Sequence, residues 1–160
     1  MRTYNIPDLD QFFMNEAIKQ AMIAAENDEV PVGAVITYQN KIIAKAYNQV
    51  ELLKDPTAHA EMIAITQASN FLSSKWLYEC SLYVTLEPCP MCAGAMVLAR
   101  LKKISYGAAD PKAGACGSIV NIIQHKKLNH HIEIQKGIAL ELCGEILTNF
   151  FKKQRALGKK

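Results

Sequence analysis

Two short segments of the sequence carry the residue types that bind and use a metal ion. His59-Ala60-Glu61 supplies an imidazole and a carboxylate, and Pro88-Cys89-Pro90-Met91-Cys92 supplies two thiols. Zinc prefers thiolate and imidazole ligands, and three protein ligands leave the fourth tetrahedral position open for water. The segments therefore predict a catalytic site in which His59, Cys89 and Cys92 bind one Zn²⁺ per chain.

The spacing of these residues is typical of helix starts. Cys89 and Cys92 are three residues apart, so in the first turn of a helix they share a face, where unpaired N–H groups favour thiolates. His59 and Glu61 are two residues apart, which directs them about 200° apart in a regular helix. Both can face one metal only if His59 caps the helix, so we expect the helix boundary at Thr57 or His59.

Glu61 is predicted to be the general base of this site. Two thiolates and a neutral imidazole cancel the charge of zinc, so water at the metal ionises less readily than at an all-histidine site. A separate base is therefore needed. The Glu61 carboxylate can take a proton from the polarised water and return it to the substrate.

Two other interpretations of the cysteine pair stay open from the residues alone. A redox C-x-x-C is one, although nothing around Pro90-Met91 resembles a redox motif. The second is a structural zinc knuckle, although such sites usually combine two short-spaced ligand pairs and the sequence contains one. Its fourth ligand would be another cysteine, His125, His130 or His131. We expect the remaining cysteines to be small buried residues, namely Cys80, Cys116 and Cys143.

The composition is that of a globular protein. The chain has 160 residues, of which half are apolar and 21% are charged. No apolar run approaches the ~20 residues of a membrane span, and residues 1–10 lack the apolar segment of a secretory signal. We therefore expect a cytoplasmic protein with no membrane partner.

The positive charge of the chain is concentrated at its end. The net charge is +3, and the last nine residues carry five basic side chains and no acidic one. Such a run is typical of a solvated helix end, where cations complement the macrodipole, and it is also compatible with nucleic-acid contact.

The periodicity of apolar residues predicts a single α/β domain over residues 1–160. We expect helices at about 8–27, 58–71, 91–101 and 118–124, and a basic C-terminal helix at about 139–157. Strands are expected at 32–37, 42–46, 81–86, 103–106 and 131–135. Strands that alternate with helices predict a three-layer sandwich with a central mixed five-stranded sheet flanked by helices. Both metal-binding segments then begin a helix.

The H-x-E and P-C-x-x-C segments resemble the signature of the zinc-dependent nucleobase deaminases of the cytidine-deaminase superfamily. Further segments make the chain similar to the bacterial tRNA adenosine deaminases over nearly its whole length: VPVGAV at 30–35, DPTAHAE at 55–61, LYVTLEPC at 82–89, CAGAM at 92–96 and GAADPKAGA at 107–115. This resemblance implies a cytidine-deaminase-like fold, a homodimer, and hydrolytic conversion of a wobble adenosine to inosine with release of ammonia.

The resemblance also implies roles for individual residues. His59, Cys89 and Cys92 would bind zinc, and Glu61 would carry protons. Asn48 would hold the target base or its ribose, and Asp110 would lie near the backbone of the flipped nucleotide. Four residues of the terminal helix would contact the anticodon stem-loop of tRNA: Phe150, Lys152, Lys153 and Arg155. Local sequence alone favours turn roles for Asn48 and Asp110 and core positions for Phe150 and Phe151.

Two alternative functions remain open from the sequence. A free-base or nucleoside deaminase acting on guanine or cytosine would share the zinc site but would not need the basic end. An inactive RNA-binding module would keep zinc for folding only, and Glu61 would then have no structural reason to lie beside the ligands.

Overall fold

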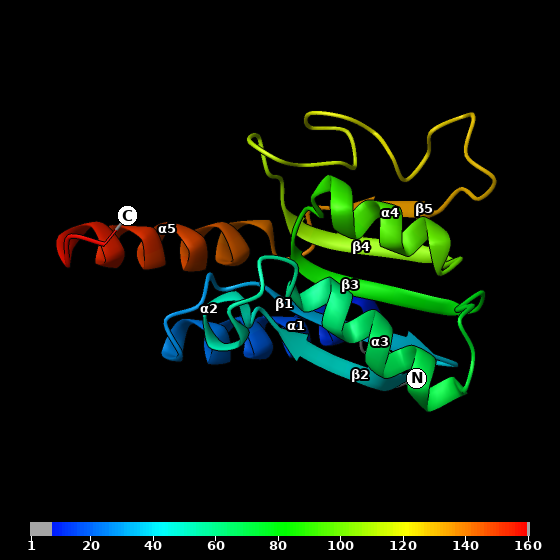
Figure 1. Cartoon of the computed structure of the whole chain (residues 1–160), viewed down its shortest axis with the longest axis horizontal. Coiled ribbons are helices and arrows are strands. Elements are labelled where there is room, and N and C mark those ends of the chain that lie inside the picture. Colours follow the sequence, from blue (N-terminus) through cyan, green and yellow to red (C-terminus); the bar gives the residue numbers. More distant parts are fainter. Residues whose placement is uncertain (1–7, 160) are drawn as a thin grey trace, which may run out of the picture.

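A computed structural model describes residues 8–159 of the chain (Figure 1). The helices are α1 (Leu9–Glu26), α2 (Val50–Leu53), α3 (Ala60–Leu72), α4 (Pro90–Leu98) and α5 (Leu140–Ala156). The strands are β1 (Gly33–Tyr38), β2 (Lys41–Tyr47), β3 (Cys80–Leu86), β4 (Lys103–Ala108) and β5 (Glu133–Lys136).

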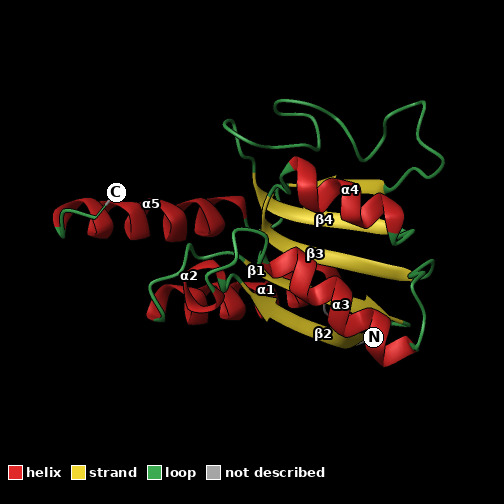
Figure 2. Ribbon diagram, in the orientation of Figure 1, coloured by secondary structure: helices red, strands yellow, loops and turns green. Residues whose placement is uncertain are grey.

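The five strands form one mixed sheet in the order β2-β1-β3-β4-β5. Strand β1 pairs antiparallel with β2 and with β3, whereas β3, β4 and β5 are parallel to one another. Helices lie on both sides of the sheet (Figure 2). The predicted three-layer α/β sandwich with a mixed five-stranded sheet is therefore confirmed.

Each face of the sheet is buried under a different pair of helices. On one face, Ala34, Ile36 and Leu82 belong to a core shared with α3 and α4. On the other face, Val35 and Tyr83 pack with Phe13 of α1 in a second, smaller core that also includes Cys143 of α5. Successive residues of a strand point to opposite faces, so the apolar runs of β1 and β3 supply both cores.

Gly33 allows α1 to lie close to the start of β1. A Cβ atom on Gly33 would lie 2.0 Å from the carbonyl oxygen of Ala17 and 2.4 Å from the amide nitrogen of Ala21. No side chain fits there without displacing the helix backbone, so this position requires glycine.

The predicted helix at 118–124 is wrong. This segment lies in a loop with a single bridge between Cys116 and Asn121. The amide of Ile122 donates to the carbonyl oxygen of Ala115 at 2.9 Å, whereas a helix over this segment would require the carbonyl oxygen of Ser118. Ile123, an apolar residue of this segment, is buried as a loop residue. The four-residue helix α2 was not predicted, and the other predicted elements agree with the structure within about three residues at each end.

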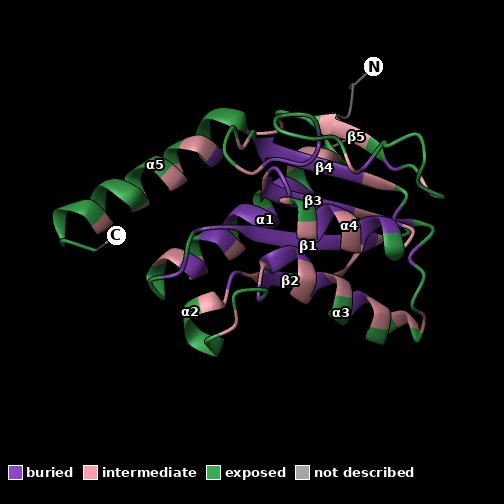
Figure 3. Ribbon diagram, turned by 45° about the horizontal axis from the view of Figure 1, so that its top comes forward, coloured by how far each residue is buried: buried purple, intermediate pink, exposed green. Residues whose placement is uncertain are grey.

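The fold brings the chemically interesting helix starts together. Helices α3 and α4 lie side by side on one face of the sheet and begin at the same end of it (Figure 1). Helix α5 extends beyond the sheet, and most of its last turns are exposed (Figure 3). Within residues 8–159, no helix has both the length and the apolar character that crossing a membrane requires.

Candidate active site

His59 and Cys89 are the N-cap residues of their helices. His59 has φ −75° and ψ 149° before α3, and Cys89 has φ −73° and ψ 171° before α4. Because these dihedrals are extended and not helical, the two side chains do not have to point in the direction that a helical residue would impose. The boundary expected at His59 is therefore confirmed, and the conflict between His59 and Glu61 at i and i+2 is removed.

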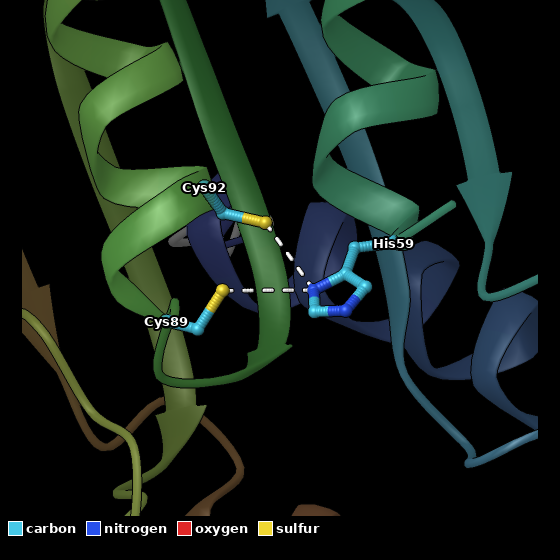
Figure 4. A group of neighbouring side chains, drawn as sticks. All are labelled: His59, Cys89 and Cys92. Atoms are coloured by element: carbon cyan, nitrogen blue, oxygen red, sulfur yellow. Dashed lines mark hydrogen bonds between the residues drawn. The ribbon is translucent and has the colours of Figure 1, made fainter. Parts of the chain in front are cut away.

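The imidazole of His59 faces both thiols (Figure 4). Its Nδ1 lies 3.6 Å from Sγ of Cys89 and 3.5 Å from Sγ of Cys92. A tetrahedral zinc with Zn–N near 2.05 Å and Zn–S near 2.3 Å requires a nitrogen-to-sulfur distance of about 3.6 Å. The donor atoms all lie within 4.8 Å of one another, so the three residues can hold a metal ion.

The histidines of the zinc-knuckle interpretation lie elsewhere. His130 Nε2 contacts the carbonyl oxygen of Leu101 at 2.6 Å, and His131 Nε2 contacts that of His125 at 3.0 Å. In the described part of the chain, no fourth histidine, cysteine or carboxylate joins the His59, Cys89 and Cys92 group. A position is therefore left for a non-protein ligand, as a catalytic site requires.

The electrostatics of the ligand group favour a thiolate at Cys89. Hydrogen bonding from Cys92, together with that from His59, holds the pKa of Cys89 well below its usual value. The same contact with Cys89, reinforced by burial, raises the pKa of Cys92. The hydrogen bond to Cys89 also raises the pKa of His59. Metal binding must displace the remaining protons, since zinc takes thiolates and a neutral imidazole.

Glu61 lies in the first turn of α3, and only 4% of its surface is exposed. Its Oε2 is buried and has no hydrogen-bond partner among the described residues. Burial raises the pKa of Glu61 to about 7. A buried carboxyl oxygen without a partner is rare and points to an absent ligand, here a water or a substrate atom.

The ligand group lies in a cavity of about 730 Å³. His59, Glu61 and Cys89 line it together with Asn48 and Asp110. The remaining lining residues come from α2, the loop after α1, the end of β3 with Glu87, the loops that contain Pro56 and Ala113, and the C-terminal part of the chain from α5 to Lys159. The cavity falls within the ~300–1,000 Å³ typical of small-ligand sites.

Asn48 has a defined structural contact. It is 7% exposed, and its Oδ1 accepts a hydrogen bond from the amide of Ala60 at 2.8 Å. His59 cannot cap α3 because its own side chain faces the thiols, and Asn48 supplies the acceptor in its place. Among the described residues Nδ2 of Asn48 donates to no acceptor, so it is available to a molecule in the cavity.

Asp110 has the turn role that its local sequence favours. Its Oδ1 accepts from the amides of Lys112 at 2.9 Å and Ala113 at 3.1 Å. Asp110 also lines the cavity, so the structure brings it to the site predicted from the resemblance, with part of its carboxylate already engaged.

The terminal helix forms one wall of the cavity. Phe150 and Phe151 both line it, and Phe151 is 43% exposed, so the assignment of the pair to the core is wrong. Lys152, Lys153 and Arg155 are exposed but do not line the cavity. The basic residue that does is Lys159, whose Nζ lies 3.5 Å from Oδ2 of Asp28, and no role was predicted for it.

Two buried carboxylates were also missed. Glu29 is 1% exposed and accepts hydrogen bonds from the amides of Glu51 at 3.1 Å and Leu52 at 2.7 Å, which holds the start of α2. Glu87 is 1% exposed and accepts from the loop after β4. Glu29 directly precedes the segment VPVGAV and Glu87 lies within LYVTLEPC, but a carboxylate that binds backbone amides carries no local signal.

Comparisons with known proteins agree with this site. A sequence model of the MafB19-like deaminase family matches residues 8–155. The chain is also 47% identical over 150 residues to a protein of Bacillus subtilis (strain 168) named tRNA-specific adenosine deaminase, a match covering 94% of this chain and 93% of the relative. The chain belongs to this deaminase family. The resemblance drawn from the sequence is thereby confirmed.

Solved structures of the family share the fold. A chain from a study of A-to-I editing by tRNA:A34 deaminases at the wobble position of transfer RNA superposes with a TM-score of 0.82 at 42% identity, covering 85% of this chain and 99% of that one. A guanine deaminase from Bacillus subtilis superposes with a TM-score of 0.59 at 40% identity, covering 62% and 64%. The deaminase scaffold therefore accommodates more than one substrate class.

The geometry predicts that Cys92→Ala will lose the metal, because two of three donors cannot complete the ligand set. Zinc content per chain, measured after exhaustive dialysis, checks this against an expected value of one for the unchanged protein. Cys143→Ala, which removes a buried thiol outside the ligand group, is the matched control and should keep its zinc. Full zinc in Cys92→Ala would show that the ligand set is wrong.

Proposed function

We propose that this protein hydrolyses the wobble adenosine in a tRNA anticodon loop to inosine and releases ammonia, with one Zn²⁺ held by His59, Cys89 and Cys92. The observation that carries the proposal is the buried, unpartnered Oε2 of Glu61 in the same cavity as this complete three-ligand set. The family relationship supports the choice of substrate.

Zinc fits the donor atoms that are present. Two thiols and an imidazole are the ligands it prefers, and their spacing matches a tetrahedral ion. When bound, zinc supplies Lewis acidity, which lowers the pKa of water in the open position. The unpartnered carboxyl oxygen of Glu61 is the group of this chain that lies ready to accept that proton.

Glu61 is proposed to carry protons in both halves of the reaction. It takes one from the attacking water and delivers it to a ring nitrogen of adenine as the C6–O bond forms. It then moves the second proton of the water to the departing amine, so that C6–N cleavage gives ammonia and inosine. The Oε2 atom of Glu61 is available for both proton transfers because no other described residue binds it.

Asn48 is proposed to orient the flipped nucleotide. Its Oδ1 is fixed by the amide of Ala60, which leaves Nδ2 to donate to the base or ribose. An adenine within a stacked loop cannot reach the site, so the base must first unstack, at a cost of a few kcal/mol that is lowest in single-stranded loops.

Helix α5 is proposed to recognise the RNA around that nucleotide. Phe150 and Phe151 lie where a flanking base could stack, and Lys152, Lys153 and Arg155 are free to contact phosphates. A tRNA substrate would also locate the enzyme in the cytoplasm. The alternative of a free-base deaminase is favoured by one observation, the likeness to guanine deaminase, and is tested below.

We also infer a homodimer, formed through the outer faces of α3 and α4. Phe71 at the end of α3 is 65% exposed, and Leu98 at the end of α4 is 79% exposed. Contiguous apolar side chains mark association surfaces, and Leu98 lines one surface hollow together with Ile65 of α3 and Trp76. Sedimentation analysis should show a dimer, and Leu98→Lys should shift it toward the monomer.

Glu61→Gln should strongly lower turnover while keeping zinc and fold, because it removes the proton carrier but no metal ligand. General acid–base catalysis contributes typically 10²- to 10⁴-fold, which is the expected loss in kcat. Glu51→Gln, which neutralises an exposed carboxylate at the rim of the same cavity, is the matched control. Turnover of Glu61→Gln within a few-fold of the unchanged enzyme would remove Glu61 from the mechanism.

Two substitutions of Asn48 should separate its two roles. Asn48→Asp keeps an acceptor for the amide of Ala60 but removes the Nδ2 donor, so kcat/KM should fall while thermal stability changes little. Asn48→Ala removes both groups and should also lose about 1 kcal/mol of stability, the usual value of a helix cap. Equal kcat/KM for Asn48→Asp and the unchanged enzyme would leave Asn48 with the capping role alone.

Neutralising Lys152, Lys153 and Arg155 together should weaken binding of an anticodon hairpin and flatten its salt dependence, by about 0.7 log–log units per lost phosphate contact. The matched control neutralises Lys41, Lys75 and Lys102, which are exposed at the opposite end of the sheet. Inosine formation should be far faster on the hairpin than on free adenosine, because a nucleoside provides no remote binding energy. Salt-insensitive turnover of free guanine, cytosine or adenosine that matched the hairpin would favour the free-base alternative.

A further inference from the structure

Glu87 is the most completely hydrogen-bonded side chain in the cavity wall. It follows β3 and precedes the metal ligand Cys89 by two residues. Its carboxylate accepts from the amide of Asp110 at 2.9 Å and from the amides of Cys116 and Ser118 at 3.1 Å each. The hydroxyl of Ser118 donates a fourth hydrogen bond. All four donors belong to residues 110–118, which we call the substrate-side loop.

The loop also fits tightly against this carboxylate. A Cβ atom on Gly114 would lie 2.1 Å from Oε2 of Glu87, so only glycine leaves room for it. The next residue, Ala115, donates its amide to the carbonyl oxygen of Pro88 at 2.8 Å. The loop is thus attached to two consecutive residues, Glu87 and Pro88, immediately before the Cys89 ligand.

The hydrogen bonds assign Glu87 a role different from that of Glu61. A carboxylate offers about four lone-pair sites, and four donors occupy those of Glu87. None is left for a substrate proton. No lysine or arginine among residues 8–159 forms an ion pair with Glu87, so its charge is compensated by these donors.

We propose that Glu87 is a positioning residue, which fixes the substrate-side loop relative to the metal-binding end of α4. Two residues of that loop, Asp110 and Ala113, line the cavity opposite α2. Loss of the Glu87 contacts would let them move, and misplacement of a bound nucleotide by about 1 Å can cost 10²-fold in rate. This catalytic consequence rests on the proposed deaminase function, whereas the structural part does not.

The main test is Glu87→Gln, measured by hydrogen exchange and by kinetics on the anticodon hairpin. The Gln side chain keeps one acceptor oxygen, but its NH₂ group cannot accept from N–H donors, so part of the network is lost at constant size. We expect the amides of Cys116 and Ser118 to exchange at least about tenfold faster, with those of α1 unchanged. Zinc should stay at one per chain, and kcat/KM should fall at least about tenfold.

Milder variants keep the test valid if Glu87→Gln does not fold. Ser118→Ala removes one donor and should give a smaller change of the same kind. Gly114→Ala places a methyl group against Glu87 and should mimic Glu87→Gln, whereas Gly144→Ala, which meets no atom within 4 Å, is its matched control.

Three outcomes would overturn the proposal: unchanged exchange in the substrate-side loop, an equal rise in exchange over the whole chain, or loss of zinc with the loop still protected. Exchange and zinc content do not depend on activity. Failure of the deaminase assignment would therefore appear as absent inosine with the exchange result intact.

Discussion

The structure depends on one constraint: two helices must begin side by side with their cap side chains turned toward a shared point. His59 and Cys89 both occupy N-cap positions with extended dihedrals, and this frees them to face one metal. A cap side chain that serves as a metal ligand cannot also accept a hydrogen bond from the first backbone amides of its own helix. The two helices differ in how this is compensated. In α3 the side chain of Asn48 accepts the hydrogen bond from the first amide, whereas α4 begins with Pro90, which has no N–H group. The residue expected to touch substrate is thus also the one that completes a metal-binding helix start.

Three buried carboxylates surround the cavity, and their partners separate their roles. Glu87 is bound by four donors and Glu29 by two backbone amides, so both act as fixed anions that organise the chain around the site. Glu61 alone has a buried oxygen without a partner among the described residues. Burial raises the pKa of Glu61 to about 7, whereas Glu87, despite its burial, has its pKa lowered by the Ser118 hydroxyl and the loop amides. A buried glutamate can therefore act as a proton carrier or as a structural anion, and the hydrogen-bond donors around it decide which.

The sequence predicted the parts of this protein that obey local rules. Alternating and 3.6-residue patterns of apolar residues located the five strands and the long helices. His59 and Glu61 cannot both face one metal within a regular helix, and this argument located the helix cap at His59. The predicted helix at 118–124 is absent because the amides of Val120 and Ile122 donate to the carbonyl oxygens of Gly114 and Ala115, and because Ser118 binds Glu87, a contact 31 residues distant in sequence that leaves no periodic pattern. Lys159 was missed for a related reason, since only the folded chain shows that it lies beside Asp28 at the cavity.

The difference between RNA and free-base substrates is expected to lie in the walls of the cavity. A guanine deaminase shares the scaffold over 62% of this chain. Helix α5 packs on the sheet near its start, through Cys143. The contact with β4 is so close that a Cβ atom on Gly107 would lie 2.4 Å from Sγ of Cys143. Its far end is tied to Asp28 by contacts of 3.5 Å from Gln154 and Lys159. The contact from Lys159 is an exposed ion pair, and such pairs contribute about 0–1 kcal/mol. Helix α5 is thus packed on the sheet at one end and held by exposed contacts at the other, and it is this weakly held wall, more than the His59, Cys89 and Cys92 group, that we expect to distinguish a nucleotide with its neighbours attached from a free base.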